Sequence, residues 1–264
     1  MRLFLVAGRR AFAAAIASLA LAACSGGGGG DSSGASSSLG TERTLFVPSA
    51  HTGETYSVTV YTPPGYATTT DAKPIVYALD RELQYQQVQD AVFRFQLDAI
   101  VVSVSNISGA RRFVDFELPG AEAYFRFLTL ELIPLVEAQH RVDRSRRTLM
   151  GYSLSGLMAT LAILLEQPSS RYFSGAVVTD ASFQFHTHET LALEQRMFDT
   201  SRDLPMAVHM CYTSANAPYS EMPERLASRG YRGLRMSHRY YPASHAAVLV
   251  PCVEDGLRFV FGRS

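Results

Sequence analysis

The 264-residue sequence has no tryptophan, few cysteines and no net charge. Its 24 Lys and Arg residues balance 24 Asp and Glu residues, which argues against a nucleic-acid partner, because such proteins carry an excess of basic side chains. Beyond the N-terminal region, no apolar run approaches the roughly 20 residues that a membrane-spanning helix requires. The rest of the chain has ordinary globular composition and is long enough for one domain with a large core.

The N-terminal region has the pattern of a secretory signal. Three arginines precede or flank an apolar run, Ala11–Leu21, that is too short to cross a membrane. The run ends in Leu21-Ala22-Ala23-Cys24, which resembles a bacterial lipobox. We therefore predict a lipoprotein signal peptide over residues 1–23, with Cys24 as the lipidated N-terminus. The alternative is a plain secretory signal with an incidental cysteine.

A tract rich in glycine and serine follows, and it lacks the apolar residues that a core requires. We predict a flexible tether over residues 24–40 and a single folded domain over residues 41–264. The serine after Cys24 resembles lipoproteins that are sorted to the outer membrane. We therefore expect the chain on the periplasmic side of a bacterial cell envelope, with the lipid anchor as its only contact with a membrane.

Within the folded domain, segments with the pattern of strands alternate with segments of helical periodicity. The expected strands are 42–48, 55–62, 73–79, 99–105, 147–150, 175–179, 206–212 and 234–241. The expected helices are 84–96, 121–139 with a break or kink near Pro134, 157–166, 188–198, 221–229 and 253–261. This alternation predicts an α/β-hydrolase fold, with a mostly parallel sheet, helices on both faces and antiparallel strands at one edge.

The stretch GYSLSG, residues 151–156, is close to the Gly-x-Ser-x-Gly pattern of a nucleophile elbow, but Ser155 replaces the second glycine. A predicted strand enters it and an apolar helix leaves it, as an elbow requires. Only small neighbours fit in such a turn, and Gly151 and Ser155 are small. We therefore interpret Ser153 as a nucleophile, although small-residue turns also precede helices without any catalytic role.

A nucleophilic serine needs a base, and His245 lies after the last predicted strand, where an α/β-hydrolase carries its base. Four other histidines precede the serine or lie within predicted strands: His51, His140, His209 and His238. His186 and His188 stand near Glu189 in a pattern that suggests a metal site, but no third ligand cluster accompanies them. We predict neither a metal nor an organic cofactor.

Further segments resemble the esterase D family of α/β-hydrolases. Residues 120–163, which contain ELIP, HRVD and GYSLSG in that order, resemble the family's central part. The segment SHAAVLVPCVEDGLRFVFG resembles its histidine segment and last helix, while PIVYALDRE and RRFVDF resemble a strand ending in Leu-Asp-Gly and an Arg-rich loop. The likeness spans residues 44–262 and is closest to the branch of periplasmic siderophore esterases. The family also contains feruloyl esterases, S-formylglutathione hydrolases and mycolyltransferases.

The resemblance implies that Ser153 is the nucleophile and His245 the base. It also implies an oxyanion hole that uses a backbone N–H after Leu-Asp, where the family often has glycine and this chain has Arg81. Any residue except proline carries a backbone N–H, so we expect Leu154 and Arg81 to be the donors.

The residue that orients His245 stays open at this point. Asp180, at the end of a predicted strand, could reach the histidine from the neighbouring strand. Glu221 is a second candidate, and a Ser-His dyad with the neutral Asn216 is a third. The state of Cys211 and Cys252 also stays open, since the two cysteines either form a disulfide in an oxidising compartment or remain buried free thiols.

These observations predict a serine hydrolase that cleaves a small-molecule carboxylic ester through an acyl-enzyme on Ser153, with His245 as general base. The resemblance implies a siderophore-type or aryl ester. Acyl transfer to an alcohol would use the same residues. The alternative from a different class is a non-catalytic binding protein on a decayed hydrolase fold.

Overall fold

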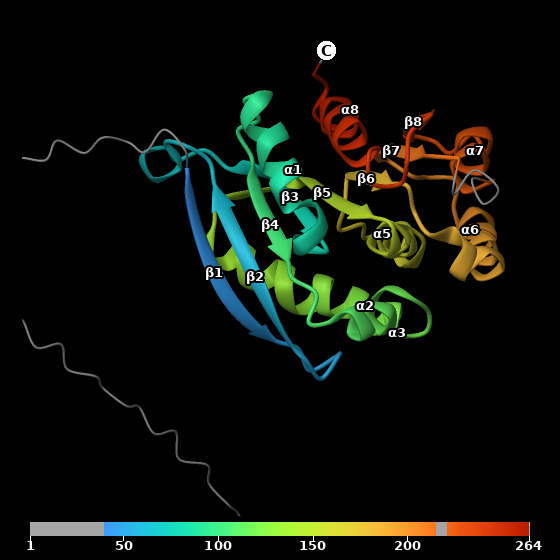
Figure 1. Ribbon diagram of the computed structural model, residues 1–264, viewed down its shortest axis with the longest axis horizontal. Coiled ribbons are helices and arrows are strands. Elements are labelled where there is room, and N and C mark those ends of the chain that lie inside the picture. The colour runs from blue at the N-terminus through green and yellow to red at the C-terminus, as the bar shows by residue number, and fades with distance from the viewer. Residues whose placement is uncertain (1–39, 215–220, 264) are drawn as a thin grey trace, which may run out of the picture. The chain divides into compact units, whose positions relative to one another are not determined.

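One mixed sheet organises the folded domain (Figure 1). The computed structural model describes residues 40–214 and 221–263, and within them eight strands lie in the order β1-β2-β4-β3-β5-β6-β7-β8. In chain order the strands are β1 (Thr41–Pro48), β2 (Thr55–Thr62), β3 (Lys73–Leu79), β4 (Ile100–Val104), β5 (Val142–Tyr152), β6 (Gly175–Thr179), β7 (Ala207–Tyr212) and β8 (Arg235–Tyr240). β1 pairs antiparallel with β2, β2 pairs antiparallel with β4, and all other pairs are parallel. The predicted α/β-hydrolase fold is thereby confirmed.

Helices cover both faces of this sheet. α1 (Arg81–Arg94) and α8 (Leu249–Phe261) pack together on one face. The opposite face is covered by α2 (Gly109–Phe116), α3 (Gly120–Arg126), α4 (Ile133–Gln139), α5 (Leu154–Leu165), α6 (Thr187–Thr200) and α7 (Glu221–Ser228). β3 is buried along its whole length, and its alternate residues enter the two cores, as expected for a strand covered on both sides. None of the helices in residues 40–214 and 221–263 is long and apolar enough to cross a bilayer.

Several predicted elements differ from the structure, among them α1, which starts at Arg81 and not at residue 84, and α8, which starts at Leu249 and not at residue 253. α5 begins at Leu154, directly after Ser153, and not at Leu157. β5 is longer than expected at both ends and reaches Tyr152. The Arg-rich segment expected as a loop is helical within α2, because the Ser108 hydroxyl accepts a hydrogen bond from the Arg111 N–H and so caps the helix.

The helix predicted over residues 121–139 with a break or kink near Pro134 stays helical throughout, but it is irregular before the proline. α3 gives way to a π-helical segment, Phe127–Leu132, before α4 starts at Ile133. Pro134 stands in the first turn of α4, directly after the π-helical segment, and it has no backbone N–H to donate. The π-helical segment therefore occupies the turn before the proline, where a proline ring disturbs regular α-helical hydrogen bonding.

Cys211 on β7 and Cys252 on α8 form a disulfide, which settles the pairing that the sequence left open. Both residues are buried, and the bridge closes a loop with a sequence separation of 41 residues. That loop contains β8 and His245, so the bridge fastens both ends of the segment that carries the histidine.

We expect the double variant C211A/C252A to lose about 4 kcal/mol of unfolding free energy, because the bridge restricts a loop of this length in the unfolded chain. Urea unfolding of the variant, of oxidised wild type and of wild type in reductant measures the loss. Equal midpoints for all three would show that the bridge adds no stability.

His209 on β7 is a buried histidine beneath α8. Its Nδ1 lies 3.1 Å from the Ser237 hydroxyl, and Nε2 has no hydrogen-bond partner among the described residues. Burial lowers the pKa of the His209 imidazole from its ordinary value of 6.5 to about 4. The folded protein therefore holds this ring neutral at pH values where the unfolded chain protonates it.

The consequence is a loss of stability in acid. The contribution of His209 is fully present above pH 6.5 and falls as the pH drops to about 4, with a loss approaching about 3 kcal/mol. We expect H209Q to show a shallower decline in unfolding free energy between these pH values than wild type. H238Q, which changes an exposed histidine on the neighbouring strand, should keep the wild-type slope. Identical slopes for H209Q and wild type would contradict the assignment.

Candidate active site

Ser153 occupies the turn between β5 and α5, at the edge where the parallel strands end. Its backbone has φ 60° and ψ −120°, a strained conformation that occurs at functional turns. The turn is held from both sides, because the Ser153 N–H donates to the Thr179 carbonyl at 2.9 Å and its carbonyl accepts from the Ser182 N–H at 3.1 Å. The chain thus fixes Ser153 through β6 and the loop after β6.

The neighbours of Ser153 are small because the backbone crosses itself there. A Cβ on Gly151 would lie 1.9 Å from the Ser155 carbonyl oxygen, and a Cβ on Gly156 would lie 3.1 Å from Ala181 Cβ. Ser155 is fully buried, and its hydroxyl accepts from the Tyr152 N–H at 3.0 Å and donates to the Tyr152 carbonyl at 2.9 Å. Ser155 therefore stabilises the turn through two hydrogen bonds and is also small enough to fit into it.

Asp180 lies directly after β6, also with a left-handed backbone (φ 42°). Its carboxylate is fully buried, and its Oδ2 lies 2.6 Å from His245 Nδ1. Thr213 donates to the same carboxylate from both its N–H and its hydroxyl, each at 2.8 Å. These bonds aim the carboxylate at the histidine and satisfy it in the absence of solvent.

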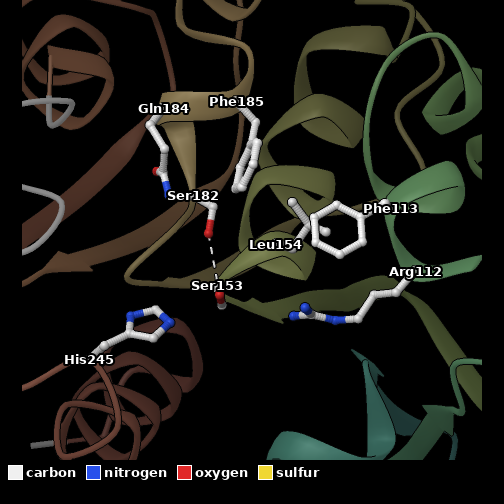
Figure 2. A pocket seen from close by; sticks show the side chains of 8 residues that line it. All are labelled: Arg112, Phe113, Ser153, Leu154, Ser182, Gln184, Phe185 and His245. Atoms are coloured by element: carbon white, nitrogen blue, oxygen red, sulfur yellow. Dashed lines mark hydrogen bonds between the residues drawn. The ribbon is translucent and has the colours of Figure 1, made fainter. Parts of the chain in front are cut away.

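His245 comes from the loop between β8 and α8. Its ring stacks on the Tyr152 ring, with 4.8 Å between centroids and an interplanar angle of 24°. The Tyr152 hydroxyl donates to the His245 carbonyl at 2.9 Å. Figure 2 shows the imidazole turned toward Ser153, so the ring stands between the buried carboxylate and the serine.

A cavity of about 450 Å³ opens over Ser153 (Figure 2). Its walls are Arg112, Phe113, Ser153, Leu154, Ser182, Gln184, Phe185 and His245. Phe113 and Phe185 meet edge to face at 6.0 Å between centroids, and both are about half exposed. The Ser153 Oγ lies 3.2 Å from the Ser182 Oγ inside this cavity.

Arg112 brings positive charge to the cavity wall. Its Nε lies 2.6 Å from the carboxylate of Asp80, which is fully buried. Asn106 donates to the other oxygen of that carboxylate at 2.6 Å. Because Asp80 is itself held in place, the guanidinium of Arg112 has a fixed position beside the serine.

The two predicted oxyanion donors stand at the starts of helices. Leu154 begins α5 and Arg81 begins α1, and the first N–H groups of a helix have no acceptor within it. Ala78 on β3 pairs with Met150 on β5 in the sheet. Arg81 lies three residues after Ala78, and Ser153 lies three residues after Met150, so the two turns follow neighbouring strands at the same level. The Arg81 side chain points elsewhere, since it lies over the Tyr85 ring and lines a different cavity.

Glu221, the other described candidate for orienting His245, makes its ion pair elsewhere. The Glu221 side chain is 60% exposed and pairs with Arg225. Asn216 and Cys24 lie outside the described residues. His186 contacts Glu117 at 3.2 Å, and the described residues contain no group of three or more His, Cys, Asp or Glu that could hold a metal.

Sequence reasoning missed Tyr152, Ser182, Thr213 and Arg112. Tyr152 stood inside the quoted motif, but nothing in its neighbours reveals that its ring meets a histidine 93 positions away. Ser182 and Thr213 follow two different strands, and only the order of strands in the sheet brings them to Ser153 and Asp180.

The sheet, with a serine on a strand-to-helix turn, defines an α/β-hydrolase. Residues 49–229, well over half of the chain, match the family model described as putative esterase. The chain therefore belongs to the putative esterase family, as its sequence suggested, and is a carboxylic ester hydrolase.

Individual proteins are similar to this chain in sequence or in fold. The ferri-bacillibactin esterase BesA of Bacillus subtilis (strain 168) is 24% identical over 229 residues, which cover 70% of this chain and 78% of that protein. An IroE-like serine hydrolase of Shewanella oneidensis has a similar structure, with a TM-score of 0.74, 22% identity and coverage of 83% and 79%. The siderophore hydrolase EstA of Aspergillus nidulans matches with a TM-score of 0.70 at 15% identity, over 84% of this chain and 94% of that one.

Proposed function

We propose that this chain is a serine esterase in which Ser153 is the nucleophile, His245 the general base and Asp180 the carboxylate that orients the base. One observation carries the proposal. Ser153 and His245 line the same cavity, and the other side of the imidazole is bound at 2.6 Å by a fully buried carboxylate. A serine, a histidine and an orienting acid in this relation are the parts of a hydrolytic triad.

The reaction follows from these positions. His245 Nε2 takes the Ser153 proton as Oγ attacks the ester carbonyl, and Asp180 stabilises the imidazolium that forms. The N–H groups of Leu154 and Arg81 hold the oxyanion of the tetrahedral intermediate. The imidazolium then protonates the leaving alcohol, and an acyl-enzyme remains. Water, activated by His245, attacks that acyl group and releases the carboxylic acid with Ser153 restored.

We propose a siderophore-type or aryl ester as substrate. Phe113 and Phe185 place two half-exposed aromatic rings in the cavity that holds the serine, which suits an aromatic acyl group. Arg112 adds a fixed cation to the same wall, which favours an acyl group with acidic or phenolic oxygens. The names of the relatives, a ferri-bacillibactin esterase and a siderophore hydrolase, support the same class.

We also propose that the protein works on the periplasmic side of a bacterial cell envelope, anchored through a lipid on Cys24. The support is the signal-like segment, the lipobox-like LAAC and the tract rich in glycine and serine that follows. Labelling with radioactive palmitate in the bacterial host, for wild type and C24S, tests the anchor. Equal labelling of both would contradict it.

A fluorophosphonate probe tests the proposed chemistry, because it reacts with an activated serine. We expect one labelled peptide, containing Ser153. Product analysis with a panel of aryl, feruloyl and siderophore esters, in water and with added alcohols, then separates hydrolysis from acyl transfer. Wild-type protein that stays unlabelled and cleaves none of these esters would leave the proposal without support and favour a binding protein.

A further inference from the structure

Tyr152, the residue before Ser153, contacts His245 in two independent ways. Its ring lies against one face of the imidazole, at 4.8 Å between centroids, and its hydroxyl donates to the backbone carbonyl of the same histidine at 2.9 Å. One contact restrains the side chain of His245 and the other restrains its loop. Burial raises the pKa of the Tyr152 phenol above its ordinary value, so the hydroxyl keeps the proton that it donates.

His245 needs such support because little else fixes its ring. It lies in an irregular segment between β8 and α8, and its side chain is 39% exposed. The bond from Nδ1 to Asp180 fixes one atom of the imidazole, and the ring remains free to tilt about that bond. A flat partner packed on one face removes this freedom. The direction of Nε2, and hence its alignment with Ser153, then depends on the plane of the tyrosine.

Tyr152 is itself held by the unusual serine of GYSLSG. The Ser155 hydroxyl binds both the N–H and the carbonyl of Tyr152, at 3.0 and 2.9 Å. A glycine, which the common motif has at this position, would provide neither bond. Tyr152 is also mostly buried at the end of β5, so the backbone that carries the ring in contact with His245 is held rigidly.

We propose that Tyr152 is a positioning residue that sets the plane of the His245 imidazole, and that Ser155 holds Tyr152 in place for this task. This inference rests on the proposed function, since it assigns a partner to the proposed base. The nucleophile elbow thus contains the nucleophile and also Tyr152, which positions the base. Ser155, the residue by which GYSLSG departs from the common pattern, holds Tyr152 in place.

Two substitutions separate the contacts. Y152F keeps the stacked ring and loses the hydroxyl, and we expect kcat to fall by about 3- to 10-fold. Y152L loses both contacts, and we expect a fall of roughly 30-fold or more. KM should change little in both variants, because Tyr152 does not line the cavity. Y240L, which removes an aromatic contact with Tyr212 on neighbouring strands, should keep the wild-type kcat.

A double-mutant cycle with H245A makes the test specific. If Tyr152 acts through His245, adding Y152L to H245A leaves the residual rate unchanged. S155A should lower kcat in wild type and add little to Y152L. A wild-type kcat in Y152L, or independent effects of Y152L and H245A, would overturn the inference. A wild-type kcat in H245A would instead overturn the proposed function, so the two failures are distinguishable.

Discussion

S153A is expected to lower kcat/KM on an activated aryl ester by roughly 10⁴- to 10⁶-fold. The substitution removes the only atom that the proposed mechanism acylates, and the backbone N–H groups alone retain a small residual rate. The fold should persist, since both residues carry a Cβ and the strain at φ 60° is unchanged. Initial rates measure the loss of activity, active-site titration with the fluorophosphonate probe should find no labelled site, and urea unfolding checks that the fold persists.

Ser182 provides the matched control for this prediction. Its hydroxyl is 3.2 Å from the Ser153 Oγ and lines the same cavity, so it is a competing candidate for the nucleophile. S182A loses one hydrogen bond to the nucleophile, and we expect at most about a tenfold loss. If S182A abolishes labelling while S153A keeps it, the assignment of the nucleophile is wrong.

D180N is expected to lower kcat by roughly 10³- to 10⁴-fold with little change in KM. An asparagine amide that donates to Nδ1 forces the imidazole proton onto Nε2, which then cannot accept the proton of Ser153. The amide also carries no charge to stabilise the imidazolium. KM should stay close to the wild-type value because Asp180 is fully buried and does not line the cavity.

Glu221 is the control, since it is the other carboxylate that the sequence offers as a partner of His245. Its side chain is largely exposed and pairs with Arg225, so E221Q should leave kcat and KM unchanged. Thermal unfolding of D180N checks that the bonds from Thr213 still form. A kcat within tenfold of wild type in a folded D180N would show that Asp180 does not orient the base and would favour a Ser-His dyad.

The local parts of this fold follow from the sequence. The strands over residues 73–79 and 175–179 were predicted to the residue, because continuous apolar runs with flanking turns define buried strands. The elbow was predicted because steric crowding acts between neighbours in the chain, and Gly151 must be small to clear Ser155. The errors lie at boundaries such as the start of α5, where the helix begins inside the motif.

The partner of His245 could not be chosen in this way. Three candidates stood open because each follows a strand or loop near the correct edge, and sequence pattern does not give the order of strands. The structure places Asp180 against the histidine, 65 positions away, through the pairing of β6 with β7 and a left-handed backbone at Asp180.

By itself, then, the sequence determined the class of fold, the turn that presents Ser153 and the presence of a histidine in the loop before the last helix. These features depend on periodicity, on small residues and on order along the chain. Only the tertiary structure decided that Asp180 meets His245, that Tyr152 stacks on its ring and that Cys211 joins Cys252. Such contacts join residues that are far apart in sequence, and they form only when strands from different parts of the chain end side by side.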